Sequence, residues 1–250
     1  SWEEITTLAK RIEAAGATII NTGIGWHEAR VPTIAAKVPR AAFTHVTHRM
    51  KMENVVSIPL VATNRINTPE VAESVLSKGH ADMVSMARPF MADADFINKA
   101  AENRADEINV CIACNQACLD HTFKALRASC LVNPQACYET ELVYNPVEKP
   151  LKIGVVGGGP AGLAFASVAG KRGHKVTLFE ASDALGGQFN MAKVVPGKDE
   201  FGLTIDYFKK QMEIHGVEVS LGKKVGVEDL LSHNFDKIIV STGVTPRELK

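Results

Sequence analysis

The sequence predicts an α/β fold in two parts, each built around parallel strands. Two observations support this prediction. Short apolar runs alternate with helical patterns over residues 1–109, and a second strand–helix–strand pattern starts at Leu151. Repeated βα units indicate parallel sheets, because a crossover helix must return the chain to the same edge before each new strand. We therefore predict three segments: residues 1–109, a connector over 110–150 and a second domain over 151–250.

The first segment begins with a helical pattern over Trp2–Ala15, where apolar residues recur at helical spacing. Three short apolar runs follow, of the kind that buried parallel strands show. They are Ala17–Gly23, Ile58–Asn64 and Ala81–Arg88. Three strands cannot close a barrel. We therefore predict the C-terminal part of a (β/α)8 TIM barrel, whose other strands would lie upstream.

Helix signals in this segment fall between and after the strands. Thr68 is a favoured N-cap residue, Pro69 suits the first turn, and Gly79 suits the end of the helix. We also predict that Asp93 caps a further helix, which would run through Asn103.

The composition restricts the function. The 250 residues include 28 basic and 28 acidic side chains, and this zero net charge argues against a general nucleic-acid binder, which needs a basic excess. No apolar run approaches the roughly 20 residues that span a bilayer, and no signal peptide is evident. We expect a cytoplasmic protein with no membrane and no nucleic-acid partner. The chain starts inside a helical pattern without an initiator Met, so we expect a fragment of a longer protein.

Four of the five cysteines lie in the connector, in the pattern Cys111-x2-Cys114-x3-Cys118-x11-Cys130. Thiolates bind soft metals and iron–sulfur clusters. The first three cysteines let one loop hold three irons of a [4Fe–4S] cluster, and the distal cysteine would take the fourth. Tetrahedral zinc is one alternative, although zinc sites usually pair two CxxC or CxxC/HxxxH motifs, and free thiols are another. Cys137 lies outside the spacing, and we expect a plain buried or semi-buried thiol there.

A glycine loop opens the second domain. Gly157, Gly159 and Gly162 form a GxGxxG motif directly after a predicted strand over residues 152–156. The first glycine permits the tight turn, the second lets the backbone approach a pyrophosphate, and the third lets the helix pack on the strand. Glu180 ends the next strand, where an acid accepts hydrogen bonds from ribose hydroxyls. These residues predict dinucleotide binding. A glycine-rich turn in an unrelated α/β protein is the alternative.

Later residues favour FAD over NAD(P). A second glycine turn contains Gln188, and a strand over residues 235–243 ends in Ser241-Thr242-Gly243. This strand ending resembles the signature of flavoproteins with two dinucleotide domains, in which the glycine approaches the flavin nucleotide. An ordinary buried strand that ends in a turn is the alternative.

The loops after the first three strands carry further candidates. Arg65 follows the middle strand and Arg88 follows the last, and paired arginines at this end of a barrel suit the phosphate of FMN. His27 follows the first strand, where it could donate a proton or orient a substrate carbonyl. Surface arginines and a structural histidine are the alternatives.

Three features coincide: the run Ser85–Phe90 at the barrel end, the cysteine run 111–118 and the glycine loop 156–162. Together they resemble the iron–sulfur flavoenzymes related to old yellow enzyme, over essentially the whole chain. This family includes bacterial NADPH-dependent 2,4-dienoyl-CoA reductases, trimethylamine dehydrogenase and clostridial enoate reductases. The run Gly23–Thr33 is most similar to the dienoyl-CoA reductases.

The resemblance implies roles for individual residues. It implies that His27 is the active-site histidine and that the four connector cysteines ligate [4Fe–4S]. The FMN phosphate would be held by Arg65, Ala87 and Arg88. FAD would be contacted by Ala161, Glu180, Gln188, Lys198 and Val225, in addition to the glycine loop and Gly243.

The resemblance also implies an oxidoreductase that uses FMN, FAD, the cluster and NADPH in fatty acid metabolism. Electrons would pass from NADPH to FAD, to the cluster, to FMN and finally to an acyl-CoA substrate. A tyrosine–histidine pair would supply the proton, but no tyrosine precedes Tyr138 here. The NADPH domain would follow Gly243. We therefore expect residues 1–250 not to turn over alone.

Overall fold

The computed structural model describes residues 1–26 and 28–245, and the contacts between residues divide the chain into two compact units. Unit 1 is Ser1–Tyr138 and unit 2 is Glu139–Lys250. The connector cysteines thus belong to the same unit as the first three strands.

Unit 1 holds a parallel sheet in which strands that follow one another in the chain are neighbours, in the order β1-β2-β3. Its elements are α1 (Trp2–Ala14), β1 (Ile20–Asn21), α2 (Thr44–Met52), β2 (Leu60–Thr63), α3 (Pro69–Ser77), β3 (Met83–Ser85), α4 (Arg88–Ala92), α5 (Phe96–Ala101), the 3-10 helix η1 (Ala105–Glu107) and α6 (Leu119–Phe123). The predicted parallel arrangement is confirmed. Sequential pairing is also the order of strands in a barrel wall, and the barrel itself stays a prediction.

The helix signals of unit 1 have two different outcomes. The prediction for α3 is confirmed, since the Thr68 hydroxyl accepts from the Val71 amide and Pro69 occupies the first turn. The prediction for Asp93 is wrong. Asp93 is the C-cap of α4, and the next helix runs only over Phe96–Ala101. One oxygen of the Asp93 carboxylate accepts the amide of Asp95, the N-cap residue of that helix, and the other accepts the amide of Asn109 from a distant segment.

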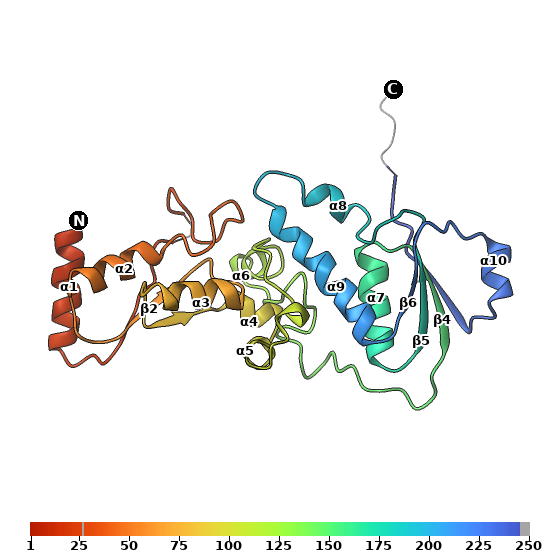
Figure 1. The fold of residues 1–250 in the computed structure, drawn as a ribbon, viewed down its shortest axis with the longest axis horizontal. Coiled ribbons are helices and arrows are strands. Elements are labelled where there is room, and N and C mark those ends of the chain that lie inside the picture. The colour runs from red at the N-terminus through yellow and green to blue at the C-terminus, as the bar shows by residue number, and fades with distance from the viewer. Residues whose placement is uncertain (27, 246–250) are drawn as a thin grey trace, which may run out of the picture. The chain divides into compact units, whose positions relative to one another are not determined.

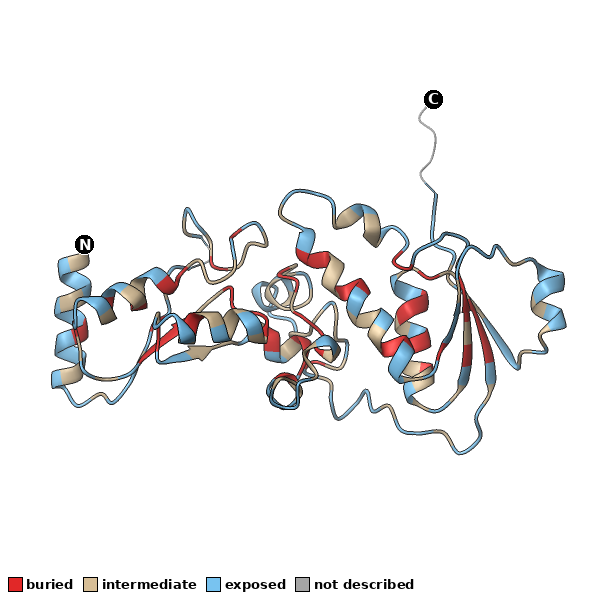
Figure 2. Ribbon diagram, viewed as in Figure 1, coloured by how far each residue is buried: buried red, intermediate tan, exposed pale blue. Residues whose placement is uncertain are grey.

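The core of unit 1 forms around β2 in two clusters. Leu60 packs with Ala9 of α1 and Met50 of α2, whereas Ala62 packs with Val75 of α3. Leu60 and Ala62 are two residues apart in the strand, so their side chains lie on the same face and belong to different clusters along its length. Figure 2 shows the resulting red, buried stretch at β2.

Unit 2 is a four-stranded parallel sheet in the order β6-β5-β4-β7. Counted from β4 this order is 3-2-1-4, which is the Rossmann arrangement, with its switch point between the first and fourth strands. The elements are β4 (Lys152–Val156), α7 (Pro160–Lys171), β5 (Lys175–Phe179), α8 (Phe189–Ala192), η2 (Asp199–Phe201), α9 (Gly202–Ile214), β6 (Glu218–Ser220), α10 (Val227–Ser232) and β7 (Lys237–Val240).

The register of unit 2 brings the ends of the central strands together. Val156 at the end of β4 lies opposite Phe179 of β5 and Val240 of β7. The loops that follow these strands therefore meet at one edge. Helices α7 and α9 pack together beside the sheet (Figure 1). The core forms where apolar residues of β4 and α7, such as Val155 and Leu163, are fully buried.

None of the helices in residues 1–26 and 28–245 combines the length and the apolar character that crossing a membrane requires.

Candidate functional site

The four connector cysteines converge in unit 1. Cys111, Cys114, Cys118 and Cys130 line one small pocket, together with apolar side chains and Arg88. All four are half-buried free thiols. Cys137 does not line the pocket and is exposed, so the expectation of a buried or semi-buried thiol there is wrong. The tertiary fold therefore brings the distal cysteine to the same pocket as the other three, and their role as cluster ligands stays a prediction.

Local backbone geometry turns the cysteine loop inward. Ala113 and Asn115 adopt left-handed conformations, with φ of 51° and 62°, on either side of Cys114. Asparagine tolerates this region, but alanine adopts it at a cost of about 1–3 kcal/mol. The turns let backbone amides face sulfur: the amides of Ala113 and Gln116 hydrogen-bond to Cys111 and Cys114 respectively.

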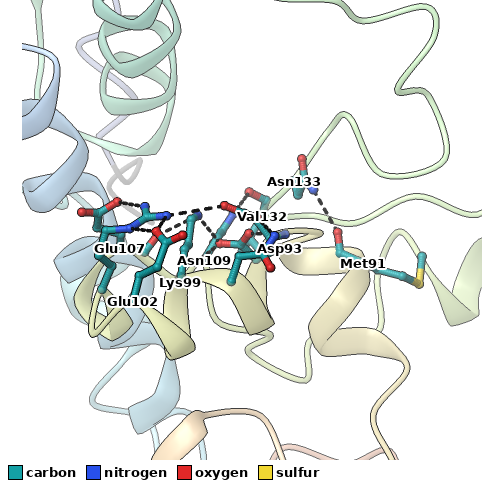
Figure 3. A network of polar contacts seen from close by, with 11 residues as sticks. Met91, Asp93, Lys99, Glu102, Glu107, Asn109, Val132 and Asn133 are labelled. Atoms are coloured by element: carbon teal, nitrogen blue, oxygen red, sulfur yellow. Dashed lines mark hydrogen bonds and ion pairs between the residues drawn. The ribbon is translucent and has the colours of Figure 1, made fainter.

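A buried polar network fixes the two arms that carry Cys111 and Cys130 (Figure 3). The Asn109 side chain donates to the Val132 carbonyl at 2.7 Å, and the Asn109 amide donates to the Asp93 carboxylate at 2.8 Å. Lys99 forms an ion pair with Asp93 at 2.6 Å. Nearby, the Asn133 amide group donates to the Met91 carbonyl at 2.9 Å. This network, which we call the Asn109 clamp, joins the segment before Cys111 to the segment after Cys130.

The thiols are shifted towards their neutral form. Burial raises the pKa of Cys111 and Cys114, and burial raises the pKa of Cys130 to about 11. Smaller increases come from neighbouring cysteines: Cys118 acts on both Cys111 and Cys114, while Cys111 and Cys114 act on Cys130. These effects agree with the single pocket that the four cysteines line. A bound cation would reverse the preference, because metals bind the thiolate.

A zinc ion and a four-iron cluster require different arrangements of the four cysteines around the pocket. A single zinc ion needs its sulfur ligands gathered at about 2.3 Å from one centre. Within residues 1–26 and 28–245, no group of three or more His, Cys, Asp or Glu side chains has the arrangement to hold a metal ion. A four-iron cluster has a wider ligand shell, because each cysteine binds a different iron. Four cysteines around one pocket fit that donor set, since the known clusters are held by four thiolates.

The predicted FMN-phosphate residues lie at the loops after β2 and β3. The Arg65 guanidinium is buried and donates to the carbonyls of Val38 and Ala36. Arg88 donates to Asn115, and Ala87 is the exposed N-cap residue of α4. Their assignment to a phosphate stays a prediction, as does the catalytic role of His27, which lies outside the described residues.

The glycine loop of unit 2 is shaped by close backbone approaches. Gly157 has φ of 108°, and a Cβ there would lie 2.4 Å from the Ser241 carbonyl oxygen. A Cβ on Gly162 would lie 1.9 Å from the carbonyl oxygen of Gly157. Gly159 is the N-cap of α7, and no side chain caps that helix. The amides of the first turn, which includes Ala161, are thus available to an anion.

Glu180 lies beside this loop at the end of β5. Its carboxylate accepts from the Gly158 amide at 2.6 Å and from the amide and hydroxyl of Ser182, both at 2.8 Å. Burial alone would raise the pKa of Glu180, but the combined hydrogen bonds from Ser182 and Gly158 outweigh it and lower the pKa. The carboxylate is therefore ionised and oriented next to the loop that would hold a nucleotide.

The remaining predicted FAD residues lie in the loops of unit 2. Gln188 donates to the Val244 carbonyl at 2.6 Å, which brings the second glycine turn to the segment that contains Gly243. Val225 lies two residues after Lys223, whose backbone amide donates to the Glu180 carbonyl. Lys198 is exposed at the start of η2. Their contacts with FAD stay predictions.

Two protein families match this chain, and each match lies within one of the two units. Residues 2–107 match the NADH:flavin oxidoreductase / NADH oxidase family. Residues 155–213 match an NAD(P)-binding Rossmann-like domain.

Individual relatives match almost the whole chain. The "Metal reductase" of Desulforamulus reducens is 42% identical over 97% of this chain and 37% of its own length. The "NADH oxidase" of Thermoanaerobacter brockii is 37% identical over 98% of this chain and 38% of its own length. A solved 2-naphthoyl-CoA reductase in complex with 2-naphthoyl-CoA is similar with a TM-score of 0.95 and 32% identity, over 99% of this chain and 38% of that one. The chain therefore spans little more than a third of the length of these proteins.

Proposed function

Since residues 2–107 belong to the NADH:flavin oxidoreductase / NADH oxidase family, we propose that this protein is an iron–sulfur flavoenzyme that reduces a conjugated carbon–carbon double bond with electrons from NADPH. The observation that carries the proposal is the pocket lined by four cysteines in the unit that carries this family's segment. The nucleotide-binding loop of unit 2 supports it, because a second flavin needs such a loop.

The proposed ligand roles follow from the two sites. Cys111, Cys114, Cys118 and Cys130 would hold [4Fe–4S], and the loop from Gly157 to Gly162 would hold the pyrophosphate of FAD with Glu180 on the ribose. Phosphate oxygens of FMN would join or replace the backbone carbonyls that Arg65 and Arg88 now contact. When bound, these groups supply hydride and single-electron transfer, and the chain supplies their placement and electrostatic surroundings.

We further propose an acyl-CoA substrate, specifically a 2,4-dienoyl-CoA that is reduced to an enoyl-CoA in fatty acid oxidation. The run Gly23–Thr33 supports this choice by its resemblance to dienoyl-CoA reductases. The fold similarity to a 2-naphthoyl-CoA reductase supports the acyl-CoA class. His27 would protonate the carbon next to the one that receives the hydride, together with a tyrosine from outside this chain.

The cluster is tested first, on the chain as it stands. Anaerobic purification is expected to give a brown protein with about four irons per chain. Cys130→Ser is expected to lose the cluster, whereas the matched control Cys137→Ser is expected to keep it, because Cys137 is exposed and outside the pocket. A colourless, zinc-loaded protein contradicts the proposal. Full iron in Cys130→Ser with loss in Cys137→Ser moves the fourth ligand to Cys137.

The substrate is tested on the full-length protein that contains this chain. NADPH oxidation is followed with a 2,4-dienoyl-CoA and with cinnamate, and reduction of an artificial electron acceptor is followed with trimethylamine in the absence of NADPH. We expect the dienoyl-CoA to give the highest kcat/KM. A higher value with cinnamate assigns an enoate reductase, and turnover of the amine assigns a dehydrogenase. Either result contradicts the dienoyl-CoA assignment but leaves the cluster and flavin sites in place.

A further inference from the structure

Arg88 lies between the cysteine loop and the loop after β1. It is half-buried at the start of α4, directly after β3. Its guanidinium donates to the Asn115 side-chain oxygen at 2.7 Å, and it reaches the carbonyls of Thr33 and Ile34 at 3.4 Å each. Asn115 in turn donates to the Ile34 carbonyl at 2.9 Å. Asn115 thus holds the guanidinium in one place next to Cys114.

The charge of Arg88 has no anionic partner in the described part of the chain. Its three acceptors are neutral oxygen atoms, and no carboxylate pairs with it there. It is also the one charged side chain among the described residues that line the cysteine pocket. Its positive charge favours the ionised forms of Cys111 and Cys114. A half-buried cation beside four thiols suits an occupant that carries negative charge.

We propose that Arg88, held by Asn115, raises the reduction potential of the cluster in the cysteine pocket. This inference rests on the proposed function, because it requires the cluster. A cluster held by four thiolates is negatively charged, and the electron that reduces it adds a further negative charge. A fixed positive charge at the pocket wall therefore stabilises the reduced form more than the oxidised form. Net charge and hydrogen bonding around the sulfur atoms are known controls of cluster potential.

The experiment is an anaerobic redox titration of the full chain with dithionite, which supplies the single electron, read by the paramagnetic signal of the reduced cluster. Arg88→Met is expected to lower the equilibrium constant for reduction at least tenfold, which is 59 mV for one electron. Arg88→Lys keeps the charge and is expected to recover most of the loss. Lys124→Met is the matched control, because Lys124 is exposed in the same segment and does not line the pocket; it is expected to change the constant less than threefold.

Several outcomes separate the inference from the proposed function. If the wild-type chain loads no iron, the proposed cluster fails and the inference fails with it. If iron-loaded Arg88→Met reduces within threefold of wild type, the inference alone is overturned. If Arg88→Met also loses FMN, its cluster potential is compared with that of wild type from which the flavin has been removed. Equal cluster potentials in these two proteins assign Arg88 to the flavin phosphate only and overturn the inference. If Arg88→Met loads no iron, the redox titration is carried out on Asn115→Leu instead. This variant releases the guanidinium and is expected to lower the equilibrium constant for cluster reduction at least threefold. An unchanged constant overturns the inference.

Discussion

Replacing Asn109 by alanine is expected to destabilise unit 1 by about 1–2 kcal/mol. The change removes the donor to the half-buried Val132 carbonyl, and an unsatisfied buried group costs about 1–3 kcal/mol, so the lower part of this range applies. Part of this cost is offset, because the Asn109 side-chain oxygen itself is buried without a partner and disappears in the variant. Asn109→Asp has almost the same shape but is expected to cost more than alanine, since its carboxylate would be buried facing the Val132 oxygen and close to Asp93.

The assay is urea unfolding followed by tryptophan fluorescence. Both tryptophans of the sequence, Trp2 and Trp26, belong to unit 1, so the signal reports that unit. With a slope of about 2 kcal/mol per molar urea, the expected shift of the midpoint is about 0.5–1 M. The matched control is Asn98→Ala, which removes a side-chain bond of the same length, 2.7 Å, from an exposed position and is expected to shift the midpoint little.

The expected order of midpoints is wild type and Asn98→Ala together, then Asn109→Ala, then Asn109→Asp. Equal midpoints for wild type and Asn109→Ala refute the role of the Asn109 clamp. A midpoint for Asn109→Asp above that of Asn109→Ala refutes the electrostatic part of the reasoning, because the buried charge is the reason for expecting aspartate, which keeps the shape of asparagine, to be less stable than alanine.

Three further predictions concern other parts of the chain. Gly162→Ala is expected to abolish FAD retention during purification, since its Cβ would lie 1.9 Å from the Gly157 oxygen. Gly202→Ala is the control, because its Cβ would meet only ordinary contacts. Full flavin content in Gly162→Ala contradicts the reasoning. Thr68→Ala is expected to lower the unfolding free energy by about 1 kcal/mol in urea titrations through loss of the α3 N-cap, and an unchanged midpoint contradicts that role. The hydrogen bond from the Leu60 amide, and then the one from Lys51, lower the pKa of Asp82 in the folded state. The ionised carboxylate therefore stabilises the fold above its unfolded pKa of about 3.9. This stabilisation is lost as the pH falls through the lower pKa of the folded state. Thermal unfolding of Asp82→Asn is accordingly expected to depend less on pH than that of wild type between pH of about 5 and 2, and parallel profiles contradict the assignment.

Local signals in the sequence were sufficient for much of the fold. The caps of α3, the strand before the glycine loop and the parallel character of both sheets follow from residues close together in the chain. The Asp93 prediction used the same kind of local signal as the predictions that succeeded, but it failed because a local signal carries no information on distant partners. An acid before an apolar stretch is a helix-start signal locally, but Asp95 occupies the N-cap, and the Asp93 carboxylate binds the amide of Asp95 and the distant amide of Asn109.

The sequence by itself determined which chemistry is available. Four thiols at cluster spacing and a GxGxxG loop after a strand are fixed by covalent order, and they need no tertiary information to be recognised. Only the tertiary structure decided how these groups are held: that Asn109 fixes the two arms, and that Arg88 sets its charge beside the pocket. Those relations join segments far apart in the chain, and no local pattern encodes them, because they depend on which buried donors and acceptors the packed core brings within hydrogen-bonding distance.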